Sequence, residues 1–115
     1  LIGGNLSRNT LSTSGYHSID VINTINIDLA FMSCSGFGLD TGFTSGSHAE
    51  CELKRAVIKK ARRKIMLMDS SKQDKRMPFT FAHLSDIDVL VTDSGIHDII
   101  VTAARTNNVN VINNI

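Results

Sequence analysis

Residues 67–76 of this 115-residue chain, LMDSSKQDKR, place a carboxylate, two hydroxyl groups and a lysine directly after an apolar run. A lysine such as Lys72 can contact a phosphate as a point charge, while serine hydroxyls and backbone N–H groups complete the hydrogen bonding around it. Asp69 can accept hydrogen bonds from ligand hydroxyl groups or orient Lys72. The stretch therefore predicts an anion-binding site, and an ordinary polar turn is the alternative interpretation.

A glycine-rich stretch at residues 35–46 is the second candidate for ligand contact. Its spacing, Gly-x-Gly-x-x-x-Gly, is one residue longer than the dinucleotide-binding fingerprint, and it lacks the Gly-Lys-Ser/Thr of a P-loop. Glycines in a loop can still present backbone N–H groups to an anion, and a helix that starts near Ser47 would add its dipole. The alternative is a surface loop whose glycines serve turns.

Metal and nucleophile motifs are incomplete. His48 and Glu50 form the His-x-Glu of zinc deaminases, but no Pro-Cys-x-x-Cys follows, and Cys34 and Cys51 are the only cysteines. No Gly-x-Ser-x-Gly elbow occurs either. We therefore expect no metal, no cofactor and no catalytic residue. Ser47 and Glu50 fit a capping box at the start of a helix better.

Basic residues are concentrated in one place. Seven of the twelve lysines and arginines fall within residues 54–64, although the net charge of the chain is only +1. We expect this run on a helix whose opposite face is apolar, where positive charge near the C-terminus is favoured by the helix dipole. A solvated face is the simpler interpretation. Nucleic-acid binding is the alternative, without help from aromatic side chains, since none lies among the charges.

The elements that must position these groups alternate between helices and strands. Helical spacing predicts a helix at about residues 15–25, a second from residue 47 with an apolar stripe that reaches Ala61, and a third near 98–106. Short apolar runs predict strands at 28–34, 64–69, 88–93 and 109–112, and the end of another at Leu1-Ile2. This alternation predicts an α/β fold with a mainly parallel sheet covered by helices on both faces. Ligands of such sheets bind at the carboxyl ends of the strands.

The length fits one domain, residues 1–115. The chain shows no initiator methionine, no positively charged leader and no apolar stretch long enough to span a membrane. We expect a soluble segment of a larger protein. Two cysteines in an α/β pattern suggest neither a disulfide framework nor a metal site, which fits a reducing cytoplasm.

Taken in order, these motifs closely resemble the C-terminal sensor domain of DeoR-family transcriptional regulators over nearly the whole chain. The resemblance is carried by LIGG at 1–4, DLAFMSCSGFGLDTGFT at 28–44, AECELKR at 49–55, DSSK at 69–72 and LSDIDVLVTD at 84–93. The serine-rich, methionine-rich and basic details look like a repressor of sugar utilisation, of the lactose or fructose phosphotransferase type.

The resemblance implies the fold of ribose-5-phosphate isomerase, glucosamine-6-phosphate deaminase and the CoA transferases, truncated at the N-terminus, and a pocket for a phosphorylated sugar. The family's phosphate loop, Asp-x-Gly-Thr-Thr, and its DNA-binding helix-turn-helix are absent from this chain. Operator DNA would be bound through that absent domain, and we expect a homo-oligomer with no membrane partner. The ligand contacts expected from motif and resemblance are Gly3, Gly4, Gly36, Asp40, Gly42, Thr44, Asp69, Ser70, Ser71 and Lys72.

An enzyme of the same fold is the alternative. The DSSK motif resembles the Asp-x-Ser-Lys of the isomerase, and residues 36–42 resemble the loop in which the deaminase has Asp-Gly-His. Here Thr41 and Gly42 follow Asp40, so the histidine is missing. That chemistry needs an acid and a base near the ring oxygen. We therefore expect a sensor that binds without turnover, with a sugar-phosphate isomerase-like enzyme as the runner-up and a pure oligomerisation module as a third possibility.

Overall fold

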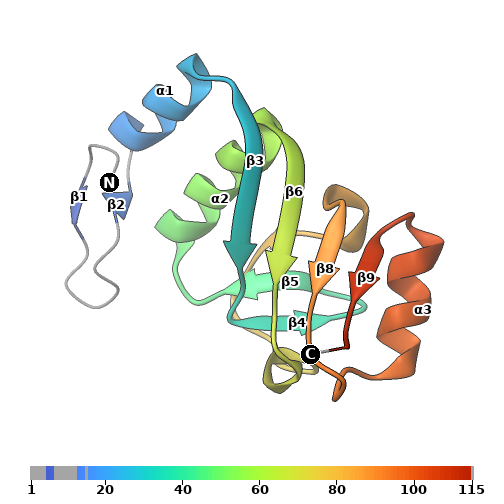
Figure 1. Ribbon diagram of the computed structural model, residues 1–115. Coiled ribbons are helices and arrows are strands. Elements are labelled where there is room, and N and C mark those ends of the chain that lie inside the picture. Colours follow the sequence, from blue (N-terminus) through green and yellow to red (C-terminus); the bar gives the residue numbers. More distant parts are fainter. Residues whose placement is uncertain (1–4, 7–12, 15, 115) are drawn as a thin grey trace.

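The computed structural model describes residues 5–6, 13–14 and 16–114 (Figure 1). Three α-helices lie in this part of the chain: α1 (Tyr16–Thr24), α2 (His48–Lys60) and α3 (Asp98–Thr106). Two short strands, β1 (Asn5–Leu6) and β2 (Thr13–Ser14), pair antiparallel ahead of α1. The strand end predicted at Leu1-Ile2, with Gly3 and Gly4, lies outside the described residues.

A four-stranded parallel sheet confirms the predicted α/β class. Its strand order is β3-β6-β8-β9, and all neighbouring pairs run parallel. The strands are β3 (Ile27–Ser33), β6 (Ala61–Leu67), β8 (Val89–Val91) and β9 (Asn110–Ile112). Each overlaps one of the short apolar runs, because the core-facing residues of these strands are buried as the helices pack on the sheet.

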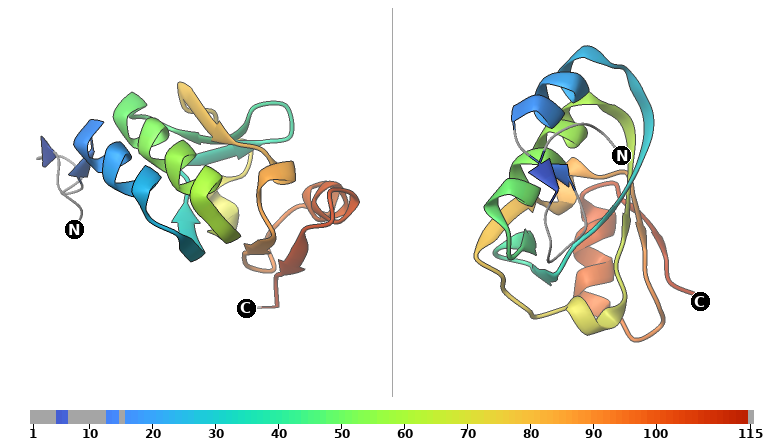
Figure 2. Two further views of the ribbon diagram at one scale, coloured as in Figure 1. Left: turned by 90° about the horizontal axis from the view of Figure 1, so that it is seen from above. Right: turned by 90° about the vertical axis from the view of Figure 1, so that its left-hand side faces the viewer.

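Both α2 and α3 pack on the same face of this sheet. Met32, Met66 and Leu90 lie side by side in the strand register and are buried. They join one core cluster with Cys51 of α2 and Ile100 of α3. Figure 2 shows the helices together on one side of the strands. The sequence predicted helices on both faces of the sheet. In the described part of the chain, the helices cover this one face.

The other face of the sheet presents apolar side chains to solvent. Phe31 is 62% exposed, and Leu29, Leu67 and Ile112 are each at least 40% exposed. These residues alternate with the buried ones along their strands, as the period of two in a strand requires. The sheet therefore has one covered face and one apolar face that the described residues leave open.

The glycine-rich stretch is a hairpin rather than a loop. Strand β4 (Gly36–Gly38) pairs antiparallel with β5 (Gly42–Ser45), which pairs in turn with β7 (Phe79–Ala82). The prediction of a loop was wrong because Phe37 and Phe43, between the glycines, are buried against each other with ring centroids 4.6 Å apart. This small sheet packs against α2.

The boundary between α2 and β6 lies earlier than predicted. Ala61 is not the end of the helical stripe: its backbone is extended (φ −76°, ψ 134°), and it pairs with Ile27 as the first residue of β6. Arg62, Arg63 and Lys64 therefore lie on a strand, not on the helix. The helix start is confirmed, since the Ser47 hydroxyl accepts the Glu50 backbone N–H at 3.3 Å. No helix in the described ranges is long and apolar enough to cross a membrane.

Candidate functional site

The carboxyl ends of β3, β6 and β8 meet at one edge of the parallel sheet, at the lower end of the strands in Figure 1. Asp69 follows β6 and caps η1 (Ser70–Lys72), a single 3-10 turn. Asp93 follows β8. The DSSK motif thus lies at the edge where ligands of parallel sheets bind.

Asp93 joins the two loops. Its Oδ2 accepts the backbone N–H of Ser70 at 2.9 Å, and its Oδ1 accepts the backbone N–H of Gly95 at 2.8 Å. Hydrogen bonds from the backbone N–H of Ser70, from its side chain and then from Gly95 hold the pKa of Asp93 below its usual value. The carboxylate is therefore an ionised acceptor at neutral pH.

Asp69 binds its own loop in a similar way. Its Oδ1 accepts the Ser71 backbone N–H at 2.9 Å and also the Ser71 hydroxyl. The hydroxyl bond is the main reason why the pKa of Asp69 is lowered, with smaller help from the backbone N–H and the charge of Lys72. The N–H groups of Ser70 and Ser71, which the sequence assigned to an anion cradle, are thus already used by two carboxylates of the protein.

Lys72 is half-buried at this edge and belongs to none of the ion pairs found among the described residues. Lys54 approaches from α2, donates to the Ser33 carbonyl at 2.7 Å and lies 4.6 Å from the centroid of the Phe81 ring. Both lysines act electrostatically on Cys34, yet burial dominates and raises the pKa of that thiol to about 11. Two positive charges therefore flank a neutral, buried thiol.

Gln73 and Asp74 connect the DSSK loop to its neighbours. The Gln73 amide donates to the Gly95 carbonyl at 3.1 Å, and its oxygen accepts the His97 N–H at 2.9 Å. The Asp74 backbone N–H donates to the Phe37 carbonyl at 2.8 Å. Sequence reasoning did not include Gln73, Asp74 or Asp93 among the site residues. Gln73 and Asp74 lie within the stretch 67–76 that predicted the site, and for Asp93 the available signal was its position after a predicted strand.

Three predicted contact residues in the hairpin have structural roles. A Cβ at Gly36 would overlap the Lys75 carbonyl oxygen, and Gly42 has a φ of 76° in the turn. Thr44 is 1% exposed; its hydroxyl donates to the Gly36 carbonyl at 3.1 Å and accepts the Met77 N–H at 3.1 Å. Each structural role accounts for the residue type at its position without a ligand. Ligand contact by these three residues stays a prediction.

Asp40 lies apart from the DSSK loop. It forms an ion pair with Arg76 at 2.6 Å between two largely exposed side chains. A cavity of about 430 Å³ beside it is lined by residues 38–41 and 74–76. A second cavity, of about 460 Å³, is lined by residues 67–69 and 91–93. Of the predicted contact residues, Asp40 lines the first cavity and Asp69 the second, whereas Lys72 lines neither of the two.

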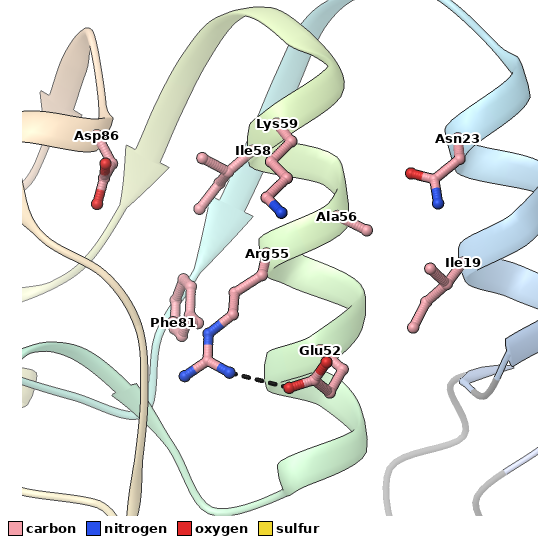
Figure 3. A pocket seen from close by; sticks show the side chains of 9 residues that line it. All are labelled: Ile19, Asn23, Glu52, Arg55, Ala56, Ile58, Lys59, Phe81 and Asp86. Carbon is pink, nitrogen blue, oxygen red and sulfur yellow. Dashed lines mark hydrogen bonds and ion pairs between the residues drawn. The ribbon is translucent and has the colours of Figure 1, made fainter.

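A third cavity, of about 400 Å³, lies between α1 and α2 (Figure 3). Ile19 and Asn23 reach into it from α1, and Arg55 on α2 is engaged with Glu52 at 2.9 Å. This cavity shares no lining residue with the two above. Across the described ranges, no group of three or more His, Cys, Asp or Glu side chains could hold a metal ion.

Known proteins with similar sequences are transcriptional regulators. A putative sgc region transcriptional regulator of Escherichia coli K12 is 32% identical over 100 residues, which cover 87% of this chain and 38% of that protein. The HTH-type transcriptional regulator GolR of Listeria innocua is 32% identical over 97 residues, which cover 84% of this chain and 38% of GolR. The HTH-type transcriptional regulator GlpR of Haloferax volcanii is 30% identical over 93 residues, which cover 81% of this chain and 36% of GlpR.

The chain spans less than half the length of these relatives. The family model described as the DeoR C-terminal sensor domain matches residues 1–94. That match covers β3 and the DSSK motif and reaches Asp93, the residues that build the edge described above. The chain therefore belongs to the DeoR C-terminal sensor domain family, as its motif order predicted.

Proposed function

We propose that this sensor domain binds a phosphorylated sugar at the carboxyl edge of its parallel sheet. Binding there modulates operator recognition by a separate N-terminal helix-turn-helix of a cytoplasmic repressor, of which residues 1–115 are part of the sensor. The observation that carries the proposal is Lys72, a half-buried cation outside the described ion pairs, whose charge acts on the ionised carboxylate of Asp69 in the same loop.

The chemistry of the edge favours a sugar phosphate over a simple anion. Two ionised carboxylates repel an inorganic anion, but they accept hydrogen bonds from sugar hydroxyl groups. Lys72 supplies the positive charge that a phosphate group needs. A ligand with hydroxyls at one end and a phosphate at the other satisfies Asp69, Asp93 and Lys72 together.

The β4–β5 hairpin lacks the features that a deaminase-like enzyme needs, which fits a domain that binds its ligand without turnover. Asp40, at the position where the related deaminase has its Asp-Gly-His, is engaged with Arg76, and Thr41 follows in place of the next residue of that motif. The nearest carboxylates at the edge accept hydrogen bonds from their own loops, which leaves them poorly suited to move a proton. Steady product formation from ribose 5-phosphate or glucosamine 6-phosphate that is lost in a Lys72 variant would contradict this part of the proposal.

The test is calorimetry with a panel of phosphosugars and their dephosphorylated forms, on the full-length regulator that carries this chain. We expect Lys72→Ala to weaken phosphosugar binding by about 1.5–3 kcal/mol, the range for hydrogen bonds to charged groups. Lys59→Ala is the matched control, because Lys59 is an exposed lysine in the last turn of α2, away from the carboxyl edge of the sheet. Equal affinity in wild type and Lys72→Ala would remove Lys72 from the site.

A further inference from the structure

A second charged surface lies at the opposite end of the parallel sheet. Where the chain turns from α2 into β6, at the upper end of the sheet in Figure 1, five of six consecutive residues are basic. We call this group the basic edge; it consists of Lys59, Lys60, Arg62, Arg63 and Lys64. The basic edge reaches Lys64 in the middle of β6, and the DSSK loop follows the carboxyl end of the same strand.

The side chains of the basic edge are available for a partner. None of its five members belongs to the ion pairs found in the described part of the chain. Lys59, Arg62 and Arg63 are exposed, and the Lys64 bond to Asp88 uses its backbone N–H. Lys54 and Arg55, earlier in the same run, are instead engaged within the domain.

The charge is concentrated here rather than spread over the surface. The chain has twelve basic and eleven acidic residues. Without the basic edge, seven basic residues would face eleven acidic ones, so the remainder of the chain is acidic. Two carboxylates lie beside the edge. Asp28 follows Ile27, the strand partner of Ala61, and Asp88 accepts the Lys64 backbone N–H through its Oδ2 at 2.8 Å. Two carboxylates do not neutralise five cations.

We propose that the basic edge contacts the phosphate backbone of double-stranded DNA. Arginine presents a planar set of donors that matches phosphate geometry, and lysine adds point charges. Residues 54–64 contain no aromatic side chain on which unpaired bases could stack, and backbone contact with a duplex needs none. The choice of DNA over another polyanion rests on the proposed function, in which a regulator holds this domain near its operator.

The experiment measures the salt dependence of binding between the 115-residue chain and a fluorescently labelled duplex of arbitrary sequence. Each neutralised phosphate contributes about 0.9 to the slope of log K against log salt, so four contacts give a slope of about −3.6. We expect Arg62→Gln combined with Arg63→Gln to reduce the magnitude of the slope by about 1.8. The matched control is Lys75→Gln combined with Arg105→Gln, which removes the same charge from exposed positions outside the edge.

The proposal predicts that the control pair keeps the wild-type slope and that unlabelled duplex displaces the probe far better than polyglutamate at equal charge. No measurable binding at about 50 mM salt, or an equal loss in both double variants, would overturn it. Equal displacement by polyglutamate would assign the edge to an acidic protein and overturn the choice of DNA. Lys72→Ala should leave the slope for DNA unchanged. The Lys72 variant therefore tests phosphosugar binding, the double variant at Arg62 and Arg63 tests DNA binding, and the two proposals can fail independently.

Discussion

The carboxylate of Asp93 accepts the backbone N–H of Ser70 at 2.9 Å, so the loop after β8 holds the loop after β6 in place. The same carboxylate accepts the Gly95 N–H at 2.8 Å, at the turn that leads to α3. One side chain thus fixes the geometry of the DSSK motif and of the neighbouring turn. This arrangement makes Asp93 a structural support of the candidate site.

The Asp93 bonds predict a change in the pH dependence of stability. The folded state lowers the pKa of Asp93 from 3.8, so its contribution is present above that value and is lost as pH falls through the folded pKa. We expect Asp93→Asn to be less stable than wild type at pH 7. The asparagine amide is neutral and has one acceptor oxygen, whereas the aspartate carboxylate is charged and accepts one N–H group on each of its two oxygens. The difference should shrink below about pH 4.

Urea unfolding at a series of pH values measures this effect. Asp20→Asn serves as the control, since Asp20 is an exposed carboxylate on α1. A difference between Asp93→Asn and wild type that stays constant from neutral to acid pH would show that the ionised carboxylate does not carry the effect.

Backbone conformation at Gly42 predicts a second result. Its φ of 76° favours glycine, and a Cβ there would overlap the Ala82 carbonyl oxygen of β7. We expect Gly42→Ala to destabilise the domain by more than about 1 kcal/mol. In Gly46→Ala the nearest atom to the new Cβ is the flexible Met77 Cε at 3.3 Å, so this variant should lose much less. Chemical denaturation of both variants compares them, and equal losses would remove the turn geometry as the cause.

What the sequence predicted well was local. The helix at 98–106 was predicted with its observed bounds, and the four parallel strands follow from apolar runs that need no knowledge of their partners. The boundary at Ala61 was missed because alanine continues the apolar stripe of α2, whereas pairing with Ile27 on a distant strand decides its conformation. Long-range pairing of this kind leaves no local signal.

In the hairpin and the candidate site, too, local features were predicted and contacts between distant residues were missed. Strands β4 and β5 have three and four residues, and β7 pairs with β5 from more than thirty residues away, so no periodicity in the sequence marked them. The DSSK motif is contiguous and was recognised. Gln73 contacts Gly95 and His97 only through the fold, and nothing about its position in the sequence distinguishes it from a surface glutamine.

The aromatic core predicts the largest loss of stability. Phe43 is fully buried, with its ring centroid 4.6 Å from that of Phe37 and 6.5 Å from that of Phe81. Phe43→Ala removes these contacts and leaves a cavity, at an expected cost of about 3–5 kcal/mol. Phe31→Ala is the matched control, because that ring is 62% exposed and should cost little. Guanidinium unfolding at low protein concentration tests the pair, and similar losses would contradict the assignment of Phe43 to the core.

The open face of the parallel sheet predicts self-association of the 115-residue chain. Strands of parallel sheets are normally covered on both faces, but here Leu29, Phe31, Leu67 and Ile112 remain exposed. The strand register makes them neighbours, since Ser33, Leu67, Val91 and Ile112 form one row and Phe31 pairs with Ile65 in the next. A continuous apolar surface of this kind favours association in water.

We expect the wild-type chain to sediment as a dimer or a larger species, and Phe31→Lys to shift it toward monomer. Ile99→Lys is the control, because Ile99 is 64% exposed on α3, away from this face. A monomeric wild type, or an equal shift in the Ile99 variant, would show that the open face does not drive association.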